Sequence, residues 1–225
     1  MFSLLLAATP SASAATYDPT TNFVAGWTAG TNPNGVWSYG YSSGLPGTVT
    51  LYTTPDSGSA LSPYALNWGG NGNAPAIYYN NGPEYNNGNT DVLANQIDLC
   101  AGWPDSNVYS DLVFTAPVSG EYNIVGSFRG DQIYIDVNVG VLGNGNPLFG
   151  SSITSLGQLA PFDTNVYLTS GETAVFYSVN AGGWENTGLD VTITQVPSAI
   201  PEPASFLLIG SALLGMAVFI RKVRG

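Results

Sequence analysis

Alternation of apolar and polar side chains over the second half of this 225-residue chain sets its fold class. In the stretch QIYIDVNV, Ile133, Ile135, Val137 and Val139 alternate with Gln, Tyr, Asp and Asn. A period of two is typical of a strand with one buried and one solvated face. EYNIVGSF and LDVTIT repeat the pattern, and NVYLTSGETAVFYSV predicts two strands joined at residues 170–171. Half-buried antiparallel strands follow.

The N-terminal half is looser. NPNGVWSYGY and GTVTLYT are typical of strands, but NWGGNGNAP and NNGPEYNNGNT are Gly/Asn/Pro-rich loops. We find no helical periodicity between Ala15 and Pro197. The sequence therefore predicts an all-β fold, an antiparallel β-sandwich of the jelly-roll type, as one domain over residues 15–196.

The chain ends in an apolar segment with a basic tip. Residues 204–220 carry no charge and span about 25 Å as a helix, the short end of what crosses a bilayer. Arg221, Lys222 and Arg224 follow, and the positive-inside bias places them in the cytoplasm. A buried helix of a soluble domain is the alternative, but it normally has a polar stripe. We predict a C-terminal transmembrane helix at 204–220 and a basic cytoplasmic tail at 221–225.

Pro201, Glu202 and Pro203 stand directly before this segment, after a short linker from residue 197. The order of motif, apolar segment and basic cluster resembles the PEP-CTERM sorting signal of Gram-negative bacteria. The resemblance implies that an exosortase-type membrane protease recognises the three residues and removes the tail. It implies a precursor anchored in the inner membrane and a product at the cell surface or in the extracellular matrix, associated with exopolysaccharide.

The other end of the chain also indicates export. Phe2 to Ala8 form an apolar run, and residues 12–14 are a small-x-small cleavage site, so residues 1–14 predict a signal peptide. No basic residue precedes the run, which indicates either a misassigned start codon or a truncated sequence. A buried N-terminal strand is the alternative.

A second resemblance covers most of residues 22–195. NPNGVWSYGY, FTAPVSGEYNIVGSFRG and LTSGETAVFYSV, in that order, are similar to uncharacterised ectodomains that accompany PEP-CTERM tails. It implies a jelly roll like those of carbohydrate-binding modules. Such proteins tend to have a Leu-His-Pro-Gly-like turn where this chain has LCAG at 99–102, and the family has no established activity to carry over.

Composition excludes several functions. Fifteen acidic residues against four basic ones give a net charge of −11, which excludes nucleic acid binding through phosphate neutralisation. The absence of histidine excludes Ser-His-Asp and Cys-His catalysis and ordinary zinc sites. The single cysteine, Cys100, forms no intrachain disulfide, and we expect it to be buried. No metal or cofactor is assigned, although the acidic, Asn-rich loops leave calcium open.

Sugar binding is the functional alternative that the residues favour. Aromatic rings fit the apolar faces of a glycan, and Asn and Asp bind its hydroxyls. Tyr134, Asp136 and Asn138 share the polar side of a predicted strand, and Trp184 lies in a predicted loop, so these four are the candidate glycan-binding residues. A second aromatic row, residues 37, 39 and 41, is more typical of a core.

A carboxylate-based glycoside hydrolase is the remaining alternative. It needs two carboxylates that flank one glycosidic bond. Asp131 with Asp136, or Glu172 with Glu185, are pairs to consider, but acidic residues are spread along the whole chain. We therefore assign no catalytic residue and expect a non-enzymatic protein.

Overall fold

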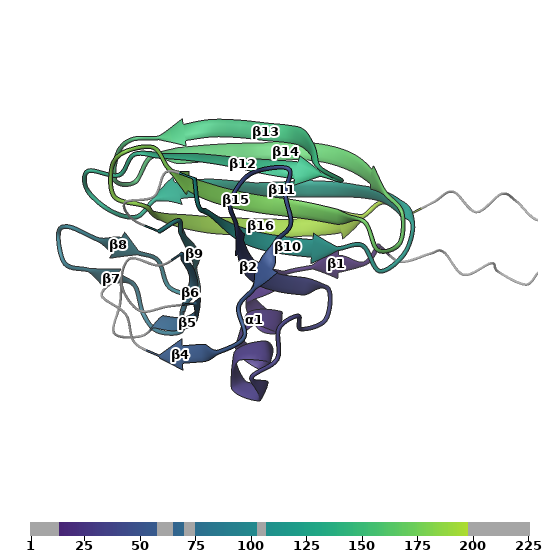
Figure 1. The fold of residues 1–225 in the computed structure, drawn as a ribbon, viewed down its shortest axis with the longest axis horizontal. Helices are drawn as coiled ribbons and strands as arrows, with labels where there is room; N and C mark the ends of the chain where they lie inside the picture. Colours follow the sequence, from purple (N-terminus) through teal and green to yellow (C-terminus); the bar gives the residue numbers. More distant parts are fainter. Residues whose placement is uncertain (1–13, 58–64, 70–74, 103–106, 198–225) are drawn as a thin grey trace, which may run out of the picture. The chain divides into compact units, whose positions relative to one another are not determined.

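The computed structural model describes residues 14–57, 65–69, 75–102 and 107–197 (Figure 1). The predicted signal peptide, Pro-Glu-Pro motif, transmembrane helix and basic tail lie outside these ranges, apart from Ala14. Within them, no helix has the length and apolar character needed to cross a membrane. Residues 14–196 form one compact unit.

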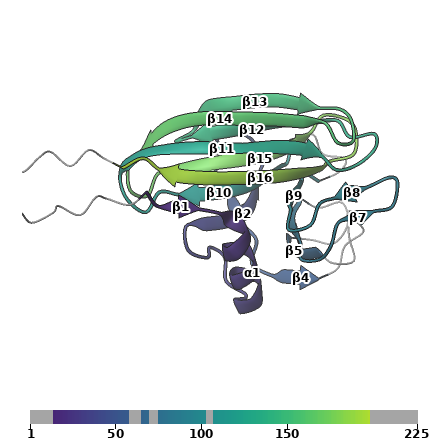
Figure 2. The same ribbon diagram turned by 180° about the vertical axis from the view of Figure 1, so that it is seen from behind.

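Two antiparallel sheets form this unit (Figures 1 and 2). Sheet A has the order β14-β11-β16-β9-β6-β5-β4, with β1 beside β16. Its strands are β1 (Thr16–Tyr17), β4 (Pro55–Ser57), β5 (Ala65–Gly69), β6 (Ala76–Asn80), β9 (Ile97–Cys100), β11 (Gly120–Gly130), β14 (Leu159–Leu168) and β16 (Asn186–Gln195).

Sheet B has the order β13-β12-β15-β10-β2-β3. Its strands are β2 (Trp37–Ser42), β3 (Thr50–Leu51), β10 (Tyr109–Thr115), β12 (Val137–Gly143), β13 (Asn146–Ile153) and β15 (Thr173–Asn180). A small hairpin, β7 (Tyr85–Asn86) and β8 (Asp91–Val92), forms a two-stranded sheet of its own, and its strands pair with no strand of sheet A or sheet B.

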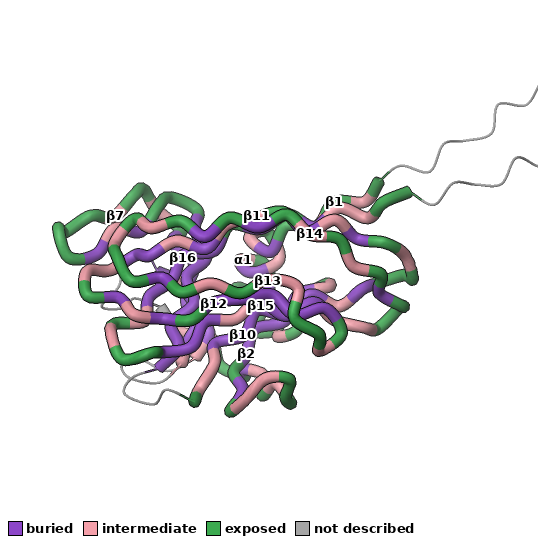
Figure 3. The backbone as a smooth tube through the Cα atoms, turned by 90° about the horizontal axis from the view of Figure 1, so that it is seen from above, coloured by how far each residue is buried: buried purple, intermediate pink, exposed green. Residues whose placement is uncertain are grey.

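One hydrophobic core joins the two sheets. Phe162 of sheet A and Phe176 of sheet B have ring centroids 6.2 Å apart. Both belong to a buried cluster to which the strands contribute alternate residues. Buried positions alternate with exposed or intermediate ones along strands such as β11 and β14 (Figure 3). The predicted all-β antiparallel sandwich is therefore confirmed, and its inward faces are the ones that period two indicates.

The expectation of no helix before Pro197 is wrong. Helix α1 (Pro19–Ala29) begins at Asp18, whose carboxylate accepts a hydrogen bond from Thr20 N at 2.7 Å, and ends at Gly30 in the left-handed region. Phe23 of this helix packs against Tyr39 of sheet B and against a tyrosine of sheet A, with centroids 4.8 and 5.7 Å away. The helix thus buries Phe23 in the core, and its partly buried Val24 and Trp27 pack against the same cluster.

The strand predicted for QIYIDVNV starts later than its alternation indicates. β12 begins at Val137, and residues 131–136 are instead the connection from β11 of sheet A to β12 of sheet B. Tyr134 has a φ of 58°, the left-handed region, so the chain turns there. Ile135 is still buried, because the connection crosses the end of the core. The two strands predicted around residues 170–171 are β14 and β15, and they lie in different sheets.

Candidate glycan-binding surface

Two of the four candidate residues form an exposed aromatic pair. The rings of Tyr134 and Trp184 meet edge to face, with centroids 6.0 Å apart and an interplanar angle of 84°. Tyr134 is 76% exposed and Trp184 is 42% exposed. They come from the two connections that pass between the sheets, residues 131–136 and 181–185. Large apolar rings held at the surface in this way offer a flat contact to a ligand.

Backbone hydrogen bonds fix these two connections to each other. Trp184 N donates to Tyr134 O at 2.9 Å, Asp136 N donates to Trp184 O at 3.1 Å, and Ala181 N donates to Asp136 O at 2.9 Å. Gly183 allows this approach, because a Cβ there would stand 2.5 Å from Asp136 N. The aromatic pair is therefore held before any ligand arrives, which reduces the entropy cost of binding.

Polar groups follow the aromatic pair. Asp136 is half-buried and lies under the turn at residues 182–183. Asn138 is exposed on β12 and accepts a hydrogen bond from Ser152 Oγ at 2.7 Å, so its amide nitrogen remains a donor. The four candidate residues thus lie at one end of β12, with the rings at the tip and the polar pair leading onto the strand.

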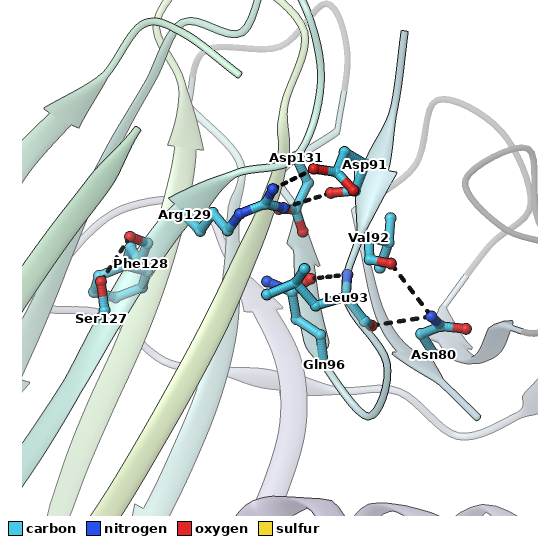
Figure 4. Close-up of polar contacts among 9 residues, drawn as sticks. All are labelled: Asn80, Asp91, Val92, Leu93, Gln96, Ser127, Phe128, Arg129 and Asp131. Atoms are coloured by element: carbon cyan, nitrogen blue, oxygen red, sulfur yellow. Dashed lines mark hydrogen bonds and ion pairs between the residues drawn. The ribbon is translucent and has the colours of Figure 1, made fainter. Parts of the chain in front are cut away.

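An ion-pair cluster lies at the end of β11 (Figure 4). Arg129 at the end of β11 makes ion pairs with Asp91 of the small hairpin and with Asp131, the latter at 2.6 Å. Its Nη1 also donates to Asp91 O at 2.5 Å. Asp131 is fully buried, and its backbone N–H donates to Asn186 O at 3.2 Å. The cluster ties the hairpin and the connection at residues 131–136 to sheet A.

Asp98 adds a further buried carboxyl to this cluster. Burial raises the pKa of Asp98 well above its usual range, and the charge of Asp131 and a hydrogen bond with it act in the same direction. Burial also raises the pKa of Asp131, to about 7, although Arg129 opposes that shift. A backbone hydrogen bond from Thr187 opposes the shift at Asp98, whereas Asp131 Oδ2 has no hydrogen-bond donor among the described residues. A proton on Asp98 shared with Asp131 gives Asp131 Oδ2 a donor and leaves Asp131 ionised beside Arg129.

The aromatic row at residues 37, 39 and 41 is core for its first two members. Trp37 and Tyr39 are fully buried, as expected, whereas Tyr41 is 37% exposed and stacks on Tyr52 with centroids 5.6 Å apart. These two tyrosines line a cavity of about 620 Å³ together with Thr50, Leu51, Thr53, Thr54, Gly69, Pro75 and Val108.

The carboxylate pairs considered for glycoside hydrolysis are not arranged for it. Glu172 and Glu185 lie at opposite ends of β15, whose eight residues span ~26 Å, against the ~5–9.5 Å that such a mechanism needs. Glu172 instead accepts hydrogen bonds from Thr169 N at 2.7 Å and from Asn144 Nδ2 at 2.6 Å. In the other pair, Asp131 is buried against Arg129.

Cys100 is buried, as the sequence predicts. Its Sγ lies 3.7 Å from Glu185 Oε1, and burial, followed by the charges of Glu185 and Asp98, raises the pKa of the thiol well above its usual value. A protonated thiol is a poor nucleophile. Within the described ranges, no group of three or more Cys, Asp or Glu side chains is placed to hold a metal ion.

Comparison with known proteins bears first on the C-terminal region. The chain carries a PEP-CTERM protein-sorting motif, whose family model matches residues 199–222. This range contains Pro201, Glu202 and Pro203, so the resemblance noted above is confirmed. No curated protein matches the sequence.

Several solved structures resemble the fold at low identity. The isomalto-dextranase of Arthrobacter globiformis T6 in complex with panose has a TM-score of 0.34 and 15% identity over 59% of this chain. The alignment covers 22% of that chain. A family 35 carbohydrate-binding module from Clostridium thermocellum has a TM-score of 0.33 and 11% identity over 81% of this chain and 98% of that one. A CBM4 structure has a TM-score of 0.33 and 14% identity over 55% of this chain and 88% of that one.

Proposed function

We propose that this protein is exported, held at the inner membrane and then sorted by an exosortase-type protease to the cell surface or extracellular matrix. The observation that carries the proposal is the PEP-CTERM motif at residues 199–222. A Pro-Glu-Pro sequence favours an extended conformation, a shape that a protease can bind. The strongly acidic composition fits a soluble surface protein better than one that binds nucleic acid.

The intact mass of the protein recovered from surface and matrix fractions tests this proposal. Cleavage predicts a species that ends near Pro203. A full-length C-terminus confined to the membrane fraction contradicts sorting and indicates a permanent anchor. Replacing Glu202 by Gln gives a matched variant that keeps both prolines, and it is expected to accumulate in the membrane fraction.

The domain boundaries belong to the same proposal. They are a signal peptide at 1–14, the sandwich at 15–196, a linker and motif at 197–203, a transmembrane helix at 204–220 and a basic tail at 221–225. A jelly-roll type of sandwich is also proposed. It is supported by the strand order, since the chain changes sheet at each connection from β9 to β12 and again from β13 to β16.

We propose further that the sandwich binds polysaccharide and has no catalytic role. The supporting observation is the fixed, exposed pair of Tyr134 and Trp184, with Asp136 and Asn138 beside it. Rings stack on the apolar faces of sugars, while the carboxylate and amide bind hydroxyls. The ligand in the cell is expected to be extracellular polysaccharide.

Retention of the protein in native gels that contain polysaccharide tests the binding proposal. Trp184→Ala and Tyr134→Ala are expected to abolish retention. Tyr167→Ala is the control, because Tyr167 is 65% exposed on β14 of sheet A, away from the two connections that carry the aromatic pair. Equal retention of Trp184→Ala and the unsubstituted chain contradicts the assigned site. Hydrolysis of a retained polysaccharide contradicts the non-enzymatic role.

A further inference from the structure

The outer face of sheet B is a surface that the aromatic pair does not include. Alternate residues of β10 and β15, such as Leu112 and Phe176, belong to the core. Their neighbours Asp111 and Tyr177 therefore point away from the core. Because directly paired residues share a face, the register places a row across the sheet on this side. The row consists of Gly40, Asp111, Tyr177, Gly140 and Gly150.

Tyr177 lies along this face instead of standing up from it. Its hydroxyl reaches over the neighbouring strand, where a Cβ on Gly140 would stand 2.5 Å from Tyr177 Oη. Tyr109 packs against the ring edge to face, with centroids 5.6 Å apart. On the far side of Gly140, a Cβ on Gly150 would meet only one atom within 4 Å, the backbone oxygen of Val139. The half-buried ring therefore covers the buried Gly140, and the exposed Gly150 of β13 lies beyond it, which together provide a platform for a planar ligand face.

Part of the face is already covered by the chain itself. Val113, Leu142 and Val175 form a small buried cluster there, under Leu45 and Val49 of the segment between β2 and β3. The cover is continuous with Gly40, where an added Cβ would meet Val49 Cγ1 at 2.6 Å. The next row along the strands has an exposed polar pair, Asn138 and Ser152. The uncovered region thus combines one aromatic platform with neutral hydrogen-bonding groups.

This region leads directly to the aromatic pair at the end of the sandwich. Along β15, Val179 lies two residues after Tyr177 and pairs with Asn138. Two residues further, Ala181 N donates a hydrogen bond to Asp136 O. Four residues of strand span ~13 Å, so Tyr177 and Asp136 are separated by more than the length of one sugar ring. Beyond Asp136 stand Tyr134 and Trp184. The two aromatic platforms are therefore spaced for different units of one chain.

The charges near this surface determine which class of polysaccharide it can bind. Outside the tail at 221–225, Arg129 is the only basic residue of the sequence. Its guanidinium is already paired with Asp91 and Asp131. No cation is therefore left to pair with a uronate or sulfate group, and the acidic residues repel one.

We propose that the outer face of sheet B, from Tyr177 and Gly150 to Asp136, binds an uncharged polysaccharide lengthwise. Tyr177 stacks on one sugar unit of the polysaccharide, and the Tyr134–Trp184 pair stacks on another. Asn138 binds hydroxyls of the sugar units between these two. The inference rests on the proposed polysaccharide binding and adds to it the class of ligand and the length of chain bound. Internal segments of a polymer are preferred to its ends.

Affinity as a function of chain length tests this inference. The full chain is first run in native gels containing dextran, hydroxyethylcellulose, galactomannan or alginate, of which alginate is the anionic probe. Calorimetry then compares a disaccharide with a hexasaccharide of the retained polymer. The variants are Tyr177→Ala and Gly150→Val, the second of which adds a side chain in open space on the face. Tyr167→Ala is the control. Trp184→Ala measures separately how much binding depends on the Tyr134–Trp184 pair.

We expect the hexasaccharide to bind more tightly than the disaccharide. Loss of one aromatic platform is expected to weaken hexasaccharide binding about tenfold in Tyr177→Ala, with little effect on the disaccharide. Gly150→Val is expected to act in the same direction, and Tyr167→Ala to have no effect. If both variants bind as the unsubstituted chain does while Trp184→Ala does not, this inference is wrong and the proposed function stands. Retention by alginate alone also overturns it, and no retention by any polymer overturns both.

Discussion

Asp98 and Asp131 place two carboxyl groups together in the interior, and neither residue exposes any surface. Only Asp131 has a cation beside it, since Arg129 lies 2.6 Å away. Two adjacent buried carboxylates repel each other, so the pair is stable when one proton is shared. The free energy of unfolding should therefore depend on pH, and Asp131 begins the connection that carries Tyr134.

The first prediction is that the protein becomes less stable as pH rises from 5 to 8. Burial raises the pKa of Asp98 above its usual range and raises the pKa values of Asp111 and Asp131 to about 7. Between the unfolded and folded pKa values, the folded state binds protons that the unfolded chain has lost. The proton on Asp111 and the single proton of the Asp98–Asp131 pair therefore stabilise the fold at low pH, and this contribution is lost as pH rises through the raised pKa values, about 7 for Asp111. Urea unfolding at four pH values measures it, and stability that rises with pH contradicts it.

Replacing Asp98 by Asn should flatten this dependence. The amide keeps the shape of the carboxyl, cannot ionise and can donate to Asp131 Oδ2. At pH 8 the variant is expected to be more stable than the unsubstituted chain. The gain is about 1.4 kcal/mol for each unit by which folding raises the pKa of Asp98 in the unsubstituted chain. Asp190→Asn is the control, because Asp190 is exposed. A steeper pH dependence in Asp98→Asn would show that Asp98 is ionised in the folded protein.

Arg129→Met is expected to destabilise the protein strongly. It leaves Asp131 buried without its cation, and removing one partner of a buried ion pair costs ~3–5 kcal/mol. It also removes the hydrogen bond to Asp91 O, so the small hairpin should exchange its amide hydrogens faster than sheet A does. Hydrogen exchange with urea unfolding measures both effects. Arg129→Lys keeps the charge and should recover part of the stability.

The sheets could be predicted from the sequence because each long strand buries one face. The alternation in residues 120–195 reads directly as inward and outward positions. Helix α1 was missed because its 11 residues include Thr, Val and Gly and bury only a narrow face, so periodicity gave no signal. Its end signals were nevertheless present, namely Asp18 before Pro19 at the start and Gly30 after the end.

The candidate site was predictable in part. Exposure of Tyr134 follows from the aliphatic face opposite it, but its contact with Trp184 joins residues 50 positions apart and depends on two connections between sheets. The cluster of Asp91, Asp98 and Asp131 could not be predicted, because charged residues are normally exposed and only tertiary packing buries Asp98 and Asp131 and half-buries Asp91. The one signal available was Arg129, a lone basic residue in an acidic domain.

A last prediction concerns the close contact that positions the aromatic pair. Gly183→Ala places a Cβ 2.5 Å from Asp136 N and 2.7 Å from Asp136 Cβ, so the turn must move away from residues 134–136. We expect weaker hydrogen bonds between the two connections, a separation of the Tyr134 and Trp184 rings, and a red shift of Trp184 fluorescence. Gly44→Ala is the control, since a Cβ there meets nothing within 4 Å. Because the turn is exposed and outside the core, Gly183→Ala should lose polysaccharide retention while losing less stability than Arg129→Met. Full retention in Gly183→Ala would mean that binding does not require the rings to be held together.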